Sequence, residues 1–127
     1  MNTVEVKHAN MVRDLVKDPR AIKDQLTSNH VQLIHMIMGI AGETGELLDA
    51  VKKHVMYGKP LDIDNVVEEL GDIEFYLAGL RQELGIGRLS ILNFNYQKLS
   101  MRYPEGSYSD AAAINRADKA QTTTEEG

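Results

Sequence analysis

The stretch that decides the fold is residues 29–57, NHVQLIHMIMGIAGETGELLDAVKKHVMY, followed by Gly58-Lys59-Pro60 and residues 62–84, DIDNVVEELGDIEFYLAGLRQEL. In both long segments aliphatic residues recur every three or four positions, which is the pattern of an amphipathic helix. Glycine at a helix C-terminus with proline just beyond it is a stop signal, and Asp62 or Asp64 can cap the next helix. The sequence therefore predicts two long antiparallel helices joined by a short loop.

The flanking regions also favour helices. Shorter helical segments are predicted over residues 5–16, 19–26, 88–101 and 110–120, and no sustained alternation or hairpin dipeptide indicates a strand. The predicted fold is all-α, an antiparallel helical bundle of four to five helices whose core is completed by oligomerisation. Residues 1–120 are expected to form a single domain, and the polar residues 121–127 a disordered C-terminal tail.

Composition excludes several classes of function. The chain has 127 residues, no cysteine and a net charge of −5. Without cysteine there is no disulfide framework or thiolate metal site, and the acidic balance without a basic patch argues against nucleic-acid binding. No signal peptide is recognisable, and no apolar run approaches the roughly 20 residues of a membrane span. A cytoplasmic protein with no membrane or nucleic-acid partner is expected.

Two acidic motifs lie in the two long helices: Glu43 and Glu46 in the first, Glu69 and Asp72 in the second. Carboxylates three residues apart share a helix face and repel each other. With Glu43 or Glu69 set to 0°, the main aliphatic arc of each helix spans roughly 20° to 140°, and the second acid lies near 300°. The acids are thus expected to border the core on the same side, where four carboxylates could meet and bind a hard divalent cation such as Mg²⁺.

Each motif alone is also common on solvated helices. Glycines inside helices are costly, and they usually mark the close approach of another helix or a ligand. The two predicted helices contain glycine at positions 39, 42, 45, 71 and 79. These glycines beside the acidic residues favour a ligand-binding site, although helix packing alone explains them equally well.

A second set of polar residues lies on the helix predicted over 88–101 and at its end. Asn95, Lys98 and Arg102 lie within about 60° of one face, and an amide, an ammonium and a guanidinium suit phosphate oxygens. A solvated polar face is the alternative. Lys53 could assist in binding phosphate, or it could simply complement the C-terminal dipole of its helix.

Three sequence segments together are similar to one known family. Residues 39–47, GIAGETGEL, and 68–73, EELGDI, resemble the Glu-x-x-Glu and Glu-x-x-Asp signature of the MazG-like family of all-α nucleoside triphosphate pyrophosphohydrolases. Residues 95–104, NYQKLSMRYP, resemble that family's third element, Asn-x-x-Lys with a following Arg. The resemblance covers about residues 29–104.

The resemblance implies a homo-oligomer, either a dimer or a tetramer, that hydrolyses a nucleoside triphosphate to the monophosphate and pyrophosphate. It implies Mg²⁺, with Mn²⁺ as a substitute, held by Glu43, Glu46, Glu69 and Asp72. Glu43 or Glu46 would be the general base, and Asn95, Lys98 and Arg102 would contact the phosphates. Two alternatives stay open: a diphosphohydrolase specialised for dCTP, dUTP or phosphoribosyl-ATP, and a non-catalytic helical module that binds a partner protein.

Overall fold

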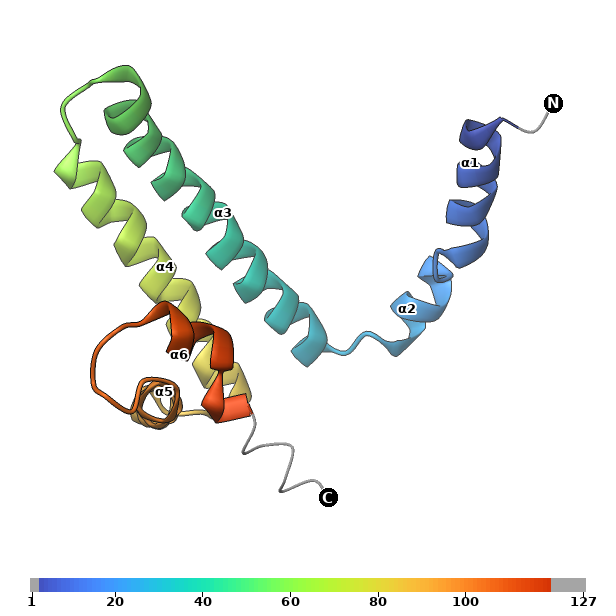
Figure 1. The fold of residues 1–127 in the computed structure, drawn as a ribbon. Helices are drawn as coiled ribbons and strands as arrows, with labels where there is room; N and C mark the ends of the chain where they lie inside the picture. Colours follow the sequence, from blue (N-terminus) through green and yellow to red (C-terminus); the bar gives the residue numbers. More distant parts are fainter. Residues whose placement is uncertain (1–2, 120–127) are drawn as a thin grey trace. The chain divides into compact units, whose positions relative to one another are not determined.

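The computed structural model describes residues 3–119, and within them every regular element is an α-helix (Figure 1). The all-α prediction is confirmed. The helices are α1 (Val4–Leu15), α2 (Pro19–Gln25), α3 (Ser28–Tyr57), α4 (Ile63–Leu84), α5 (Arg88–Arg102) and α6 (Asp110–Asn115). Residues 3–119 thus contain six helices, against the four to five of the predicted bundle. The tail predicted over 121–127 lies outside the described residues.

Helix ends follow the predicted capping chemistry. Thr27 accepts a hydrogen bond from the His30 backbone N–H at 3.2 Å, and the Thr27 backbone N–H donates to the His30 ring at 3.1 Å, which closes a capping box at the start of α3. Gly58 ends α3 with φ of 66°, a left-handed conformation that favours glycine. The Asp62 carboxylate accepts from the Asn65 N–H at 3.1 Å and opens α4.

The chain divides into two compact units, with the boundary inside α4 after Tyr76. The first unit contains α1, α2, α3 and the first part of α4. Within it, α3 and α4 run side by side in opposite directions on either side of the loop (Figure 1). The predicted antiparallel pair is therefore present.

The face along which α3 meets α4 differs from the prediction. The buried apolar residues of the described chain are Met36 and Ala50, and these lie within roughly 20° of Glu43 on the α3 helical wheel. Gly39 lies on the same side, directly against the Tyr76 ring of α4. The two helices thus meet along their acid-bearing faces, which we call the seam, because small residues there let the backbones approach.

The aliphatic arcs that were expected to form the core are only partly covered in this chain, with Leu47 on α3 and Val66 and Ile73 on α4 half-buried. On α3, Ile37, Leu48 and Val55 are 54%, 66% and 65% exposed, and Leu70 on α4 is 48% exposed. A helical wheel that counts only apolar side chains places the core on these arcs, whereas the structure places the intrachain contact at the seam. The exposed members of the arcs form a second apolar surface that the α3–α4 pair covers only in part.

The second unit contains the end of α4, α5 and α6. Gly85, with φ of 64°, ends α4 as predicted. The predicted 110–120 helix is interrupted: Arg116 adopts a left-handed φ of 49° and ends α6 at Asn115, and residues 117–119 are helical again. Asp118, just beyond α6, binds Arg102 at the end of α5. None of the helices within residues 3–119 has both the length and the apolarity needed to cross a lipid bilayer.

Candidate functional site

Three of the predicted acidic residues converge in the seam. Glu43 of α3 and Glu69 and Asp72 of α4 each offer a carboxylate oxygen, and these three oxygens lie within 4.8 Å of one another. Glu69 and Asp72 share a face of α4 because they are three residues apart. Glu43 reaches them because the Gly39–Tyr76 contact, one helical turn away on α3, brings the two helices close together.

Glu69 is the most confined of the three. It is only 9% exposed, and its Oε2 atom is buried without a hydrogen-bond partner. The pKa of Glu69 is raised from 4.5 to about 7, chiefly by the hydrogen bond it shares with Glu43, then by burial. The negative charges of Glu43, Glu46 and Asp72 add to this rise in pKa. The raised pKa means that negative neighbours and burial oppose the ionisation of Glu69 and that no positive charge offsets them.

These features match the requirements of a hard divalent cation. Mg²⁺ is bound by a small number of carboxylates and keeps its other coordination positions for water and phosphate oxygens. Three convergent carboxylates supply the first part of that set. The unpartnered Oε2 of Glu69 supplies a lone pair that nothing else in the described chain satisfies. Glu43, Glu69 and Asp72 therefore fit a metal site by their chemistry and by their placement.

Glu46, the fourth predicted ligand, lies outside this group of three. It is exposed on α3, one turn beyond Glu43. Its charge still contributes to the raised pKa of Glu69 and of Lys53, so it lies close enough to influence the cluster. Its assignment as a ligand stays a prediction.

Lys53 lies on α3 near the interhelical loop. Its ammonium group forms an ion pair with Asp49 at 2.8 Å, and both side chains are about half exposed (54% and 53%). The hydrogen bond with Asp49 also raises the pKa of Lys53. Together with Lys59 and Asn65, Lys53 lines a hollow of about 300 Å³ at the loop end of the α3–α4 pair. A phosphate group approaching this hollow would have to compete with Asp49 for the ammonium.

The other three predicted phosphate ligands lie on α5, in the second unit. Asn95 is exposed and Lys98 is half-buried. Lys98 lines a cavity of about 230 Å³ together with Asp118 and Lys119. Arg102 ends the helix with its side chain only 19% exposed, held by the Asp118 carboxylate. Two of the three predicted residues are thus gathered beside Asp118, a residue that the sequence patterns did not indicate.

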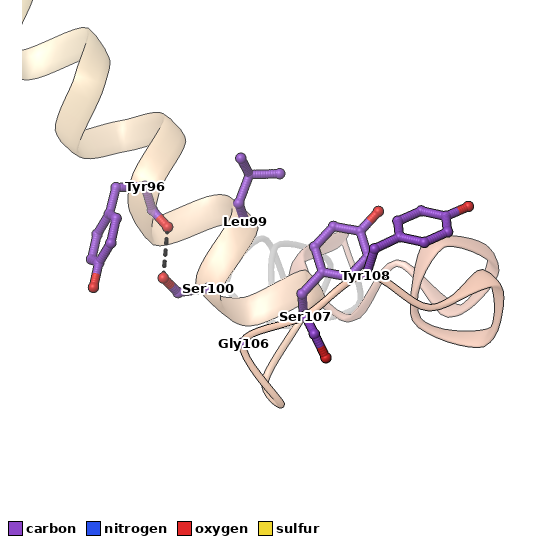
Figure 2. Close-up of a pocket in the computed structure, with 7 residues that line it drawn as sticks. Tyr96, Leu99, Ser100, Gly106, Ser107 and Tyr108 are labelled. Carbon is purple, nitrogen blue, oxygen red and sulfur yellow. Dashed lines mark hydrogen bonds between the residues drawn. The ribbon is translucent and has the colours of Figure 1, made fainter.

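A second hollow in this unit is lined by aromatic residues. Figure 2 shows Tyr96, Leu99 and Ser100 on α5, with Ser107 and Tyr108 on the loop that follows it. The hollow has a volume of about 430 Å³ and is also lined by Tyr103, whose ring centroid lies 5.7 Å from that of Tyr108. None of the predicted site residues lines it. Its walls suit apolar or flat groups rather than phosphate.

Comparison with known proteins agrees with this geometry. Residues 32–107 match the model of the MazG nucleotide pyrophosphohydrolase domain, which is more than half of the chain. The chain belongs to this MazG domain family. It is also similar to the Gene 37 protein of Mycobacterium phage L5, with 33% identity over 79 residues, or 58% of this chain and 68% of the phage protein. No solved structure matches it.

The MazG match contains every predicted site residue, from Glu43 to Arg102. Helices α1, α2 and α6 and residue Asp118 lie outside it. Sequence reasoning missed Asp118 because its partner is 16 positions away and no helical spacing links the two. It also missed Tyr76, whose contact with Gly39 shapes the seam.

Proposed function

We propose that this chain is a Mg²⁺-dependent nucleoside triphosphate pyrophosphohydrolase that cleaves between the α and β phosphates. One observation carries the proposal: three carboxylates from two helices converge within 4.8 Å, and one of them has a buried oxygen without a partner. Membership of the MazG domain family supports the same reaction class.

In this proposal, Glu43, Glu69 and Asp72 hold the cation. Glu46 is either a further ligand or a nearby negative charge that does not contact the cation. Bound Mg²⁺, or Mn²⁺ in its place, supplies a Lewis acid that polarises phosphoryl oxygens. The carboxylates would also orient the site, because Glu69 is buried inside the seam.

A carboxylate of α3 accepts the proton of the attacking water. Glu43 and Glu46 are the two candidates for this general base. Glu43 lies inside the cluster, whereas Glu46 is exposed beside it. The water oxygen bonds to the α phosphorus, and the bond from that phosphorus to the oxygen that bridges the α and β phosphates breaks. The bridging oxygen leaves with the electron pair as part of pyrophosphate.

Four polar residues would bind the polyphosphate and stabilise the charge that develops on it. These are Asn95, Lys98 and Arg102 on α5 and Lys53 on α3. Arg102 can offer two parallel N–H groups to one phosphate, and Lys98 acts as a point charge. The base and sugar of the substrate stay open between a broad (d)NTP range and a single ligand such as dCTP, dUTP or phosphoribosyl-ATP.

We also propose a homo-oligomer, a dimer or a tetramer, assembled on the aliphatic arcs. Ile37, Leu48 and Val55 of α3 and Leu70 of α4 stay exposed beside a seam that is already formed. Contiguous apolar patches of this kind usually mark an interface on a soluble protein. Two copies related by a two-fold axis would cover the arcs with each other.

The experiment is to incubate the protein with Mg²⁺ and a panel of nucleoside triphosphates and to identify the phosphorus products by ³¹P NMR. Monophosphate plus pyrophosphate is the expected result. Diphosphate plus orthophosphate, or no turnover of any triphosphate, would reject the proposal.

Two variants sharpen this experiment. Glu69→Gln keeps the shape of the side chain but removes its charge, so it should stay folded and lose activity. Glu74→Gln is the matched control, because Glu74 lies on the same helix, is exposed and belongs to no part of the cluster. Full turnover by Glu69→Gln would show that the seam does not hold the catalytic metal.

A further inference from the structure

Arg102 is held in a single orientation by one carboxylate. Its Nε–H donates to Asp118 Oδ1 at 2.8 Å, and an Nη2–H donates to Asp118 Oδ2 at 3.1 Å. The Asp118 side chain is 3% exposed and that of Arg102 is 19% exposed. Two parallel charge-assisted hydrogen bonds fix the plane of the guanidinium as well as its position.

Asp118 engages only one edge of the guanidinium. The group carries five N–H donors in a rigid fork, and Asp118 accepts from Nε and from one hydrogen of Nη2. The outer edge, formed by Nη1 and the second Nη2 hydrogen, is left for another acceptor, because Arg102 donates its side-chain hydrogen bonds within residues 3–119 to Asp118. A phosphate can therefore bind this edge while Asp118 keeps its own.

Further positive charge lies on the segments that carry the pair: Lys98 is one turn before Arg102 on α5, and Lys119 follows Asp118. Asp118, Lys98 and Lys119 line the same cavity of about 230 Å³. Arg102 is the cation that contacts the Asp118 carboxylate, and Lys98 and Lys119 add positive charge nearby. Hydrogen bonding to Arg102 lowers the pKa of Asp118, and hydrogen bonding to Asp118 raises the pKa of Arg102, so the pair stays charged.

Stability alone is a poor explanation of this pair. A buried ion pair is often no more stabilising than two well-packed apolar residues of similar volume, because both charges lose their hydration. The orientation of a guanidinium, in contrast, can be fixed only by a partner that matches its fork. Asp118 lies outside residues 32–107, so the family match does not account for it.

We propose that Asp118 is a positioning residue that holds the inner edge of Arg102, so that the outer edge, together with Lys98, binds the polyphosphate chain of the substrate. This inference rests on the proposed function. Asp118 touches no substrate atom in it and acts entirely through Arg102.

The first test compares steady-state kinetics of the wild type, Asp118→Asn, Asp118→Glu and Asp110→Asn with the triphosphate that the wild type hydrolyses best. Asp110 is the matched control, since it is an exposed aspartate of the same unit that accepts a hydrogen bond from Tyr108 at 2.8 Å. Asp118→Asn should raise KM about ten- to hundredfold, the factor carried by one charge-assisted hydrogen bond. Asp118→Glu should recover part of that loss, and Asp110→Asn should match the wild type.

Kinetics are read on the folded fraction, measured by circular dichroism. A purely structural Asp118 would lower the folded fraction and leave KM unchanged, and that result would overturn the proposal. A fall in KM would overturn it as well, because it would mean that Asp118 competes with phosphate for Arg102. In an Arg102→Lys background, Asp118→Asn should have no further effect on KM, and additive effects would contradict action through Arg102.

A second measurement uses the wild-type protein, in case Asp118→Asn does not fold. The arginine Nε–H signals are followed by ¹⁵N–¹H NMR during titration with inorganic tripolyphosphate and Mg²⁺, and the Arg102 signal is assigned by its loss in Arg102→Lys. We expect the Arg102 Nε–H to stay hydrogen-bonded to Asp118, so its signal should persist at saturation. Disappearance of the signal would overturn the proposal. A wild type that releases no pyrophosphate would instead reject the proposed function, so the two failures are distinguishable.

Discussion

Binding of Mg²⁺ to the seam should release protons in an amount set by Glu69. Its pKa of about 7 means that the metal-free carboxyl is partly protonated near neutral pH. Metal ligands must be ionised, so binding drives that proton off. Release from this group should be about 0.9 proton per site at pH 6, about 0.5 at pH 7 and about 0.1 at pH 8.

The assay is calorimetric titration with MgCl₂ in two buffers of different ionisation enthalpy at each pH. The difference in observed heat between the buffers gives the number of protons released. Glu69→Gln should release almost none at any pH and should bind more weakly, whereas Glu74→Gln should follow the wild type. Saturable binding at pH 6 with no proton release would refute the reasoning, because the metal would then be bound elsewhere.

The remaining predictions concern stability and assembly. The pKa of Glu69 is raised on folding, so its contribution to the stability of the metal-free protein is full below about pH 4.5 and is lost as the pH rises through about 7. Urea unfolding at several pH values would detect this loss of unfolding free energy. Asp118 has the opposite sign, because its pKa is lowered: its contribution is present above pH 3.8 and is lost as the pH falls, and Asp118→Asn should flatten this acid limb of the urea series. Gly39→Ala places a Cβ against an aromatic ring and should cost about 1–3 kcal/mol of unfolding free energy, whereas Gly42→Ala meets open space and should gain up to about 1 kcal/mol from helix propensity in the same denaturation assay. Leu48→Lys should reduce the oligomer mass in sedimentation equilibrium, whereas Met38→Lys, equally exposed at 67% against 66% but on another side of α3, should not.

Much of the fold could be predicted from local signals. The stop at Gly58 and the cap at Asp62 depend on residues adjacent in sequence, and the structure has both. The pairing of α3 with α4 follows from the short loop between them. The complete bundle and its oligomerisation stay predictions, because both depend on surfaces that a single chain leaves exposed.

The face used by the α3–α4 pair could not be predicted in the same way. Aliphatic counting weights Leu48 and Val55 heavily and gives glycine no weight, yet Gly39 and Ala50 decide how closely the helices approach. The sequence placed the acids at the margin of a core. The structure places Glu69 inside the contact, where its burial becomes informative.

In the candidate site, too, local sequence spacing predicted some residues and missed others. The spacing of the acidic motifs was enough to predict that Glu43, Glu69 and Asp72 would meet. Asp118 gave no such signal, since an ion pair across 16 residues depends on how the chain turns after α5 and α6. The roles of these residues stay predictions.

The contact between Gly39 and Tyr76 also fixes the register of the two helices. A slip of α4 by one turn along α3 would bring the Tyr76 ring over position 35 or position 43, and His35 and Glu43 both carry a Cβ that the ring would strike. The absence of a side chain at Gly39 therefore allows only this register and opposes sliding of one helix along the other. The opposed carboxylates keep their axial alignment even while no ion holds them together.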